Sequence, residues 1–184
     1  MSDKKKDDLR IADPIVIETE RFVLRPLTEV DVSQRYLQWF ADQDAQRFIT
    51  AAPNTTTLSA LRDYVRDRID RDDIVFLGIF VRHTLLHIGN IKYEPLDSTL
   101  GYAIMGLLIG DADWRGRGVT GEVLTASALW LRRDRNIRQI VLGVQKDNVA
   151  AIRAYEKVGF RIANTPHIPK LAENALTMVW DLNG

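Results

Sequence analysis

The chain contains no cysteine, so it can form no disulfide, offers no thiolate nucleophile and has no cysteine to ligate a metal. It also lacks a net charge, since 25 basic residues balance 25 acidic ones, and this gives no reason to expect a nucleic acid as the main partner. No apolar run approaches the length of a membrane span, about 18 residues. The charged N-terminus MSDKKKDDLR lacks the apolar stretch of a secretory signal. We therefore expect a cytoplasmic protein, a monomer or homodimer, with no membrane and no nucleic-acid partner.

Histidine is scarce as well, with 3 residues. His83 and His87 flank a predicted turn, so we expect both on the surface and predict no metal site. What is present is typical of one globular domain: 184 residues, of which 46% are hydrophobic and 27% charged. No repeat, linker or change of composition divides the chain. We therefore predict a flexible tail over residues 1–13 and a single domain over 14–184.

Hydrophobic periodicity predicts the secondary structure. Strands are expected at 21–27, 73–81, 85–96, 100–110, 138–145, 160–164 and 175–182, and helices at 28–40, at 57–71, after the glycine-rich segment as far as Arg135, and at 148–159. Thr28 with Asp31 resembles a capping box, and Asn148 and Gly159 suit the two ends of the last helix. This order predicts one mixed sheet with helices on its faces, in the α/β or α+β class. A right-handed parallel crossover should join 100–110 to 138–145.

The segment DADWRGRGVTGEVL, residues 111–124, joins the 100–110 strand to the next helix. The first amides of a helix have no intrahelical acceptor, and the helix dipole adds positive charge there. Gly116 and Gly118 let this backbone approach a ligand closely, and Arg115 and Arg117 supply forked donors. These features favour a phosphate-binding turn over the alternative, a tight turn with solvated arginines.

Three phosphate-binding patterns compete for this segment. The P-loop requires Gly-Lys-Ser/Thr, which the sequence lacks. The dinucleotide fingerprint G-x-G-x-x-G is present as Gly116, Gly118 and Gly121, but the residues DADWR separate it from the strand, whereas the fingerprint itself forms the strand-to-helix turn. The acidic residue after the next strand, Asp147, also lies beyond the usual spacing of about 20 residues. An oxidoreductase that binds NAD(P) stays open as an alternative.

The third pattern is Q/R-x-x-G-x-G/A. RGRGVT fits it with Arg115 first and Gly118 fourth, and Thr120 replaces the glycine or alanine in sixth place. Downstream, KDNVAAIRAYEKVGFRI is similar to the N-x-x-A-x-x-x-Y-x-K-x-G-F helix and strand of the GNAT acetyltransferases, which carry this pattern. Upstream, ETERFVLRPLTEVD resembles the branch with ribosomal-protein N-terminal acetyltransferases, and GLLIGDADWRGRGVTGEV resembles amino-sugar acetyltransferases. The resemblance covers residues 17 to 182, with its motifs in family order.

The resemblance implies a GNAT fold: a mixed, mostly antiparallel sheet of about six to seven strands, splayed in the middle and flanked by about four helices. It implies acetyl-CoA as cosubstrate, no metal, and a primary amine as acceptor, with direct attack in a ternary complex. The pyrophosphate would bind the main-chain amides of six consecutive residues and the side chains of the two arginines among them. These residues are Arg115, Gly116, Arg117, Gly118, Val119 and Thr120. Leu108 and Ile109 would offer backbone groups to the pantetheine arm, and an N–H of one of them would receive the carbonyl oxygen. Gly110 would mark the start of the splay.

The resemblance also assigns roles on the last helix. Tyr155 is the general acid that protonates the departing sulfur, and a phenol suits this task because it is neutral below its ordinary pKa of about 10. Asn148, about 10 Å away along the helix axis, would bind the pantetheine arm or order the helix start. From the residues alone, packing for Tyr155 and capping for Asn148 are the simpler interpretations.

The general base departs from the family pattern. Many relatives carry a glutamate on the central strand, where this chain has Ile104. Glu94 on the preceding strand is the predicted substitute, and Asp97, Asp111 or a water chain to backbone carbonyls are alternatives. Because the strand carboxylate is missing, a sensor that binds acetyl-CoA without catalysis is a further alternative function.

The acceptor is expected between the first two helices and the closing strands. Tyr36, Arg47 and Phe48 are the candidate lining residues, with Trp39 beside them. The resemblance leaves open whether the amine belongs to a protein N-terminus, an amino sugar, an antibiotic or a polyamine.

Overall fold

We describe the protein from a computed structural model, over residues 15–41, 57–168 and 171–182. The predicted tail, Arg47 and Phe48 lie outside the described residues. The helices are α1 (Gln34–Trp39), α3 (Leu58–Arg66), α4 (Val119–Arg135) and α5 (Val149–Val158), with short 3-10 helices η1 (Glu29–Asp31) and η2 (Ala112–Trp114). The strands are β1 (Ile17–Glu18), β2 (Phe22–Pro26), β3 (Val75–Val81), β4 (His87–Asp97), β5 (Tyr102–Ile109), β6 (Gln139–Gln145), β7 (Arg161–Ile162) and β8 (Ala175–Asp181).

The strands form one mixed, 8-stranded sheet in the order β1-β2-β3-β4-β5-β6-β8-β7. Every neighbouring pair is antiparallel except β5 and β6, which are parallel. The predicted mixed, mostly antiparallel sheet is confirmed, although the short strand β1 was not predicted. A sheet of this kind does not fit the doubly wound parallel sheet of the dinucleotide alternative.

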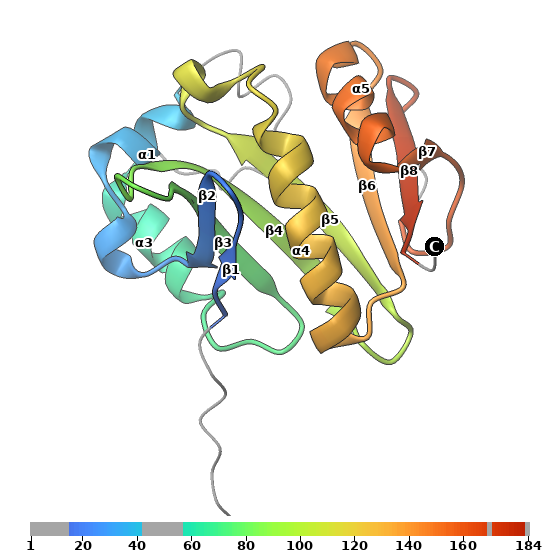
Figure 1. The fold of residues 1–184 in the computed structure, drawn as a ribbon, viewed down its shortest axis with the longest axis horizontal. Helices are drawn as coiled ribbons and strands as arrows, with labels where there is room; N and C mark the ends of the chain where they lie inside the picture. The colour runs from blue at the N-terminus through green and yellow to red at the C-terminus, as the bar shows by residue number, and fades with distance from the viewer. Residues whose placement is uncertain (1–14, 42–56, 169–170, 183–184) are drawn as a thin grey trace, which may run out of the picture.

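Apolar cores lie on both faces of the sheet. α4 and α5 cover one face, where Leu124 and Leu131 pack with Met105 of β5 (Figure 1). α1 and α3 cover the other face, where Tyr36 packs in a cluster that Leu108 of β5 borders. Met105 and Leu108 are separated by an odd number of positions, so strand alternation places them on opposite faces. A ligand that passes through the sheet would therefore meet both cores.

The sheet opens between β5 and β6. Their pairing runs from Tyr102 opposite Gln139 to Ile104 opposite Val141 and ends there. Figure 1 shows the two strands separating toward the N-terminal ends of α4 and α5. The splay is confirmed, but it begins just after Ile104 and not at Gly110, as we predicted.

Gly110 has a different role from the one predicted for it. A Cβ atom at this position would collide with the ring of Trp39, which is 5% exposed in the core beneath α1. Glycine is therefore needed so that α1 can approach the end of β5, and the splay does not depend on it.

The local capping signals are confirmed. Asp31 accepts hydrogen bonds from the main-chain N–H and the hydroxyl of Thr28, both at 2.8 Å, which completes the capping box. Asn148 caps α5 by accepting from the N–H of Ala151 at 3.2 Å. Gly159 ends α5 with a φ of 117°, a conformation that favours glycine.

Two predicted helices are shorter than expected. The 28–40 helix is divided because Val32 is extended, and Ser33 caps a new helix, α1. The 57–71 helix ends at Arg66, because the residues after it bury too little apolar surface to hold another turn.

His87 is not the surface residue that we predicted. Its ring stacks on Phe80 with centroids 4.9 Å apart and meets the ring of Trp39 at 4.8 Å. Burial lowers the pKa of His87, so the imidazole stays neutral at neutral pH. At the start of β4 this side chain points into the core beneath α1. The sequence around the short turn has no apolar pattern that would predict this orientation.

Candidate functional site

A groove with a volume of about 970 Å³ runs through the opening between β5 and β6. Pockets for small molecules and cofactors typically measure about 300–1,000 Å³, so this groove lies at the large end of that range. We call the main chain of residues 116–121, at one end of it, the amide end. We call the group Tyr36, Phe40, Tyr64 and Phe76, at the other end, the aromatic end.

The amide end is a run of N–H groups without main-chain acceptors. The amides on either side of it are bonded: Arg115 donates to the carbonyl of Ala112 and Glu122 to the carbonyl of Gly118. No main-chain oxygen of the described residues accepts from the amides between them. Gly116 and Gly118 take φ values of 72° and 76°, which favour glycine. Such a turn at a helix N-terminus forms a concave site for an anion such as a diphosphate.

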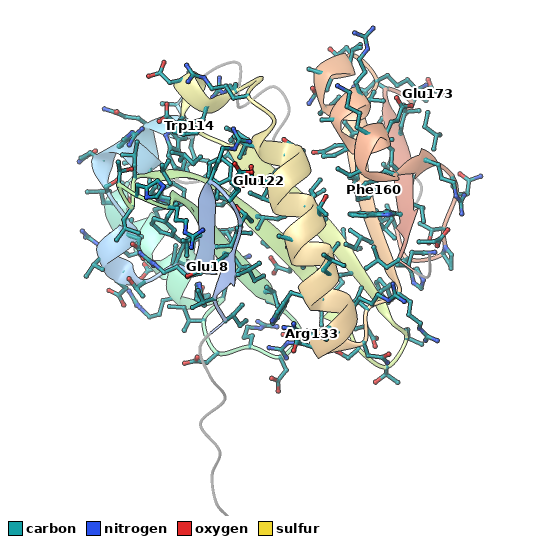
Figure 2. The ribbon with its side chains drawn as sticks, viewed as in Figure 1. Glu18, Trp114, Glu122, Arg133, Phe160 and Glu173 are labelled. Atoms are coloured by element: carbon teal, nitrogen blue, oxygen red, sulfur yellow. The ribbon has the colours of Figure 1, made fainter. Side chains whose placement is uncertain are left out.

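The arginine side chains of this segment act differently from one another. Arg115 donates from Nε to the carbonyl of Ile109 at 3.0 Å and from Nη2 to the carbonyl of Gly110 at 3.1 Å. Its guanidinium therefore ties the loop to the end of β5, whereas we had predicted a phosphate contact. Arg117 is exposed, and its guanidinium lies 6.0 Å from the ring of Trp114, which Figure 2 labels near the start of α4.

Residues next to β2 hold the same loop in place through side-chain hydrogen bonds. Arg21, at the start of β2, donates from Nη1 to the carbonyl of Arg117 at 3.0 Å and from Nε to Glu122 at 2.7 Å. The Thr19 hydroxyl and the Arg21 main-chain N–H complete the grip on this carboxylate, at 2.6 Å and 2.8 Å. Figure 2 labels Glu122 on the first part of α4. We call Thr19, Arg21 and Glu122 the Arg21 bracket; because it fixes a carbonyl of the turn, it also orients the adjoining amides.

The main-chain edge of β5 lines the middle of the groove. The carbonyl of Gly101 accepts from amides at the start of β6, and that of Ile109 accepts from the Arg115 side chain. Successive strand residues turn their N–H and C=O groups to alternate sides. Met105 and Leu107 therefore face the same side as these two residues, toward the gap that β6 has left. They offer hydrogen-bonding groups to an extended ligand arm.

This alternation corrects the predicted contact at Leu108. A Cβ atom on Gly89 would collide with the carbonyl oxygen of Leu108, so this oxygen points toward β4. The main chain of Leu108 thus completes the sheet, while that of Ile109 faces the gap. Leu107, which we did not predict, takes the second place along the groove.

Tyr155 and Asn148 line the groove from α5. Burial raises the pKa of the Tyr155 hydroxyl to about 12, so it stays protonated at neutral pH. The Tyr155 ring also packs against Phe160 with centroids 5.6 Å apart, so packing and a role in the groove are compatible. The Oδ1 atom of Asn148 is used by the helix cap, and its amide group is a separate donor.

The aromatic end surrounds a buried hydroxyl. Tyr36 is 1% exposed, and burial raises its pKa well above the ordinary value of a tyrosine. Its hydroxyl lies near Asn90 and receives no hydrogen bond of good geometry from the described residues. A buried polar group of this kind is costly unless a ligand or water completes it. Tyr36 lines the groove, and its contact with an acceptor stays a prediction.

A cluster of charges borders the aromatic end. Lys92 lies 2.7 Å from Glu94 and 3.1 Å from the hydroxyl of Tyr64, and Arg68 reaches the same carboxylate at 3.1 Å. Burial alone would raise the pKa of Glu94, but hydrogen bonds and positive charge from Lys92 and Arg68 lower it. We call Arg68, Lys92 and Glu94 the cationic cluster. A carboxylate held in this way accepts a proton less readily than an unpaired one.

The other predicted bases have structural tasks. Asp97 accepts from the amides of Thr99 and Leu100 in the turn between β4 and β5, at 2.9 Å and 2.8 Å. Asp111 caps η2 and pairs with Arg35. Neither lines the groove. Ile104 does line it, so the position that the resemblance associates with a carboxylate carries an apolar side chain here.

Sequence reasoning missed Arg21, Asn90, Lys92 and Leu107. Arg21, Asn90 and Lys92 lie against partners on other strands or helices, and the orientation of Leu107 depends on the register of β5, so no local pattern signals these features. The alternation of Asn90, Lys92 and Glu94 along β4 was the one available sign that these side chains share a face.

Two further findings limit the kinds of site that the described residues can form. Over residues 15–41, 57–168 and 171–182, no helix has the length and apolarity to cross a membrane. The same residues bring no cluster of histidine, aspartate and glutamate side chains into position to hold a metal ion. The groove is therefore the feature whose chemistry needs explaining.

Residues 21–161 match the acetyltransferase (GNAT) domain. A solved structure of RimL, a ribosomal L7/L12 α-N-protein acetyltransferase in complex with coenzyme A, is 18% identical, with a TM-score of 0.78 over 92% of this chain and 99% of that chain. Spermidine N-acetyltransferase from Vibrio cholerae, in complex with CoA and spermine, is 15% identical, with a TM-score of 0.75 over 88% of this chain and 96% of that one. Identities this low show a shared fold.

A curated relative adds a local match. The mycothiol acetyltransferase of Corynebacterium aurimucosum is 43% identical over 51 residues, which make up 28% of this chain and 16% of that protein. Because the GNAT domain match spans most of the chain and the described fold agrees with it, this chain belongs to the GNAT acetyltransferases, a family of acyltransferase enzymes that use acetyl-CoA and typically act on amines.

Proposed function

We propose that this chain transfers an acetyl group from acetyl-CoA to a primary amine by direct attack in a ternary complex. One observation carries the proposal: a single groove joins the amide end to the Tyr155 hydroxyl and to the aromatic end on the opposite face of the sheet. A thioester held from one face can then meet an amine held from the other. Positioning of this kind accounts for much of the rate in bimolecular acyl transfer.

Different parts of the groove suit the different parts of coenzyme A. The amides of residues 116–121 would bind the diphosphate, and the β5 edge at Leu107 and Ile109 would bind the pantetheine arm. An N–H on this edge would donate to the carbonyl oxygen as it gains negative charge. Gly116 supports this fit, because a Cβ at that position would meet nothing within 4 Å, so its surroundings leave room for a ligand.

The reaction balances without a cofactor. The lone pair of the neutral amine attacks the thioester carbon, and the carbon–sulfur bond breaks as the amide forms. Tyr155 gives its proton to the departing sulfur and regains one from the nitrogen, which yields coenzyme A thiol and the N-acetylated amine. Tyr155 suits this role because its hydroxyl is protonated and lines the groove.

Release of thiol from acetyl-CoA, measured over a panel of N-terminal peptides, amino sugars and other primary amines, tests the proposal. Tyr155→Phe should lower kcat by about 100-fold, because general acids contribute that much or more, while the affinity for coenzyme A stays nearly the same. Tyr102→Phe is the matched control, since its ring stacks on His167 away from the groove, with centroids 3.8 Å apart. Unchanged turnover in Tyr155→Phe would remove this tyrosine from the mechanism.

A second outcome separates this proposal from the sensor alternative. A sensor would bind acetyl-CoA with the groove intact but release no thiol with any amine of the panel. Binding of coenzyme A by calorimetry, measured beside the assay, distinguishes that result from a chain that does not bind the cosubstrate.

A further inference from the structure

We propose that the cationic cluster makes the acceptor bind as a neutral amine, so that the enzyme needs no carboxylate base and favours acceptors with a single amine and no second cationic group. This inference rests on the proposed function, because it concerns the amine that would enter the aromatic end. It replaces the predicted role of Glu94 with an electrostatic effect whose source is Lys92 and Arg68.

The cluster lies beside the place where the two halves of the groove meet. Lys92 is opposite Gly106 in the pairing of β4 with β5, two residues beyond Ile104, the last residue of β5 that pairs with β6. A Cβ on Gly106 would meet nothing within 4 Å, so the floor of the groove is open there. The side chains of Lys92 and Arg68 are 16% and 19% exposed, so water screens their charge less than at an open surface.

Within the cationic cluster, positive charge exceeds negative charge. Two cations, Arg68 from the turn after α3 and Lys92 from β4, share one carboxylate, that of Glu94. Just before β3, Arg71 and Asp73 pair with one another at 2.7 Å, and the charge of Asp67, at the C-terminal end of α3, also acts on Arg71.

Among the described residues, the other side chains that line the aromatic end carry no carboxylate, ammonium or guanidinium group. α1 contributes the phenol of Tyr36, and α3 contributes the phenol of Tyr64. Of the residues of β5 that share this face, Ile104, Gly106 and Leu108 carry no ionisable group, and Tyr102 stacks on His167 away from the groove. An ammonium ion that enters the aromatic end would therefore meet positive charge with no unpaired carboxylate among these groups.

A positive environment favours the uncharged form of an amine. The acceptor would lose its first proton to solvent as it binds, and its lone pair would then be available for attack. After the attack the nitrogen carries a second surplus proton, which restores the Tyr155 hydroxyl once that hydroxyl has protonated the sulfur. Glu94 takes no proton in this sequence, in keeping with its two cationic partners.

The same field restricts the class of acceptor. A polyamine would have to bring a second ammonium group into the excess of positive charge, whereas a peptide N-terminus or an amino sugar with one amine would not. Spermidine and spermine should therefore be poor acceptors compared with monoamines of similar length.

Binding and catalysis test this inference separately. With wild-type protein saturated by coenzyme A, calorimetry in two buffers of different ionisation enthalpy should show release of about one proton per monoamine bound at pH 7. Lys92→Met keeps the aliphatic stem but removes the charge, so proton release should fall. The acid limb of the kcat profile, which reports the amine in the enzyme–substrate complex, should move up by about one pH unit. Lys92→Arg restores the charge and should restore both readouts. The unfolding temperature of each variant shows whether it has folded.

Glu94→Gln gives the decisive contrast. If the cluster acts through its field, loss of the negative charge moves the acid limb to lower pH, opposite to Lys92→Met. If Glu94 is a general base, the same variant loses about 100-fold or more in rate. That loss, an unmoved acid limb in Lys92→Met, or binding without proton release would overturn the inference. The proposed function fails in another way, through the absence of thiol release by wild-type protein with any amine.

Discussion

The two ends of the groove are built by different means. The amide end is one contiguous segment, residues 116–121, and its binding groups are main-chain N–H groups that no side-chain change removes directly. The aromatic end gathers side chains from α1 and the residue that follows it, from α3 and from β3. The cationic cluster beside it comes from β4 and from the turn after α3. The difference indicates that the end that would hold the shared cosubstrate depends on backbone conformation, while the end that would choose the acceptor depends on residues that can vary.

A pair of glycine substitutions gives the strongest test of this difference between the two ends of the groove. Gly118→Ala forces a side chain into a positive φ of 76°, at a cost of about 1–2 kcal/mol, and should weaken coenzyme A binding about tenfold. Gly106→Ala needs no positive φ, and its methyl group would project into open space at the acceptor side of β5. It should raise the KM for the amine several-fold, with little change in coenzyme A affinity.

Calorimetry with coenzyme A and steady-state kinetics with a monoamine acceptor measure these two effects. Each variant serves as the control for the other, since both add one methyl group to the same groove. If both variants altered the same parameter, the groove would not be divided into a cosubstrate end and an acceptor end.

A substitution in the Arg21 bracket should have a smaller effect on coenzyme A affinity, and it tests the amide end alone. Arg21→Gln removes the charged hold on the Arg117 carbonyl and on Glu122, so the amides behind the diphosphate lose part of their fixed orientation. Hydrogen bonds to charged groups contribute about 1.5–3 kcal/mol when buried and less at partly exposed sites, so we expect about a fivefold loss of coenzyme A affinity.

A truncated ligand shows whether this loss acts through the diphosphate. Affinity for S-acetylpantetheine, which lacks the diphosphate, should not change in Arg21→Gln. Arg161→Gln is the control, because Arg161 pairs with Asp181 at 2.7 Å on the β7–β8 side of the sheet, away from the bracket. Equal losses for both ligands would mean that Arg21 supports the fold in general and has no particular link to the turn.

Sequence alone predicted the parts of the site that depend on neighbouring residues. The positive φ of Gly116 and Gly118 and the caps at Asn148 and Gly159 follow from backbone rules that act within a few positions. The order of strands and the mixed sheet followed from apolar periodicity, which records the buried face of each element.

The features that sequence missed depend on partners far along the chain. Arg21 reaches a carbonyl 96 positions away, and Lys92 meets the hydroxyl of Tyr64 28 positions before it. The point where β5 and β6 separate was misplaced because it depends on which residues of β6 pair, and this is set by the packing of whole strands. The register of β5 against β4 turns the main chain of Leu108 toward β4, and the residue pattern of a single strand cannot predict that register.

The smallest effect on ligand binding is expected from a change that acts on stability, in the support of α1, which carries Tyr36 of the aromatic end. Burial would raise the pKa of Asp31, but hydrogen bonds from Arg25 and Thr28 and the charge of Arg25 lower it to about 2. The unfolded chain should titrate near the ordinary value of about 3.9, so this carboxylate stabilises the fold above pH 4, and the contribution disappears as the pH falls toward 2. Because Arg25 is partly exposed, we expect Asp31→Asn to lower the free energy of unfolding by about 1–2 kcal/mol at pH 7.

Urea unfolding of the wild-type, Asp31→Asn, Arg25→Gln and double-mutant proteins at pH 7, 4 and 2.5 would measure this contribution. The coupling energy between Arg25 and Asp31 should be largest at pH 7 and small at the lowest pH, because protonation removes the same charge as the substitution. Coenzyme A affinity at pH 7 should not change in Asp31→Asn, since the amide end begins α4 on one face of the sheet and η1 contacts α3 on the other face. A loss of that affinity would show that the two ends are mechanically coupled through β2, where the ion pair with Asp31 and the Arg21 bracket meet.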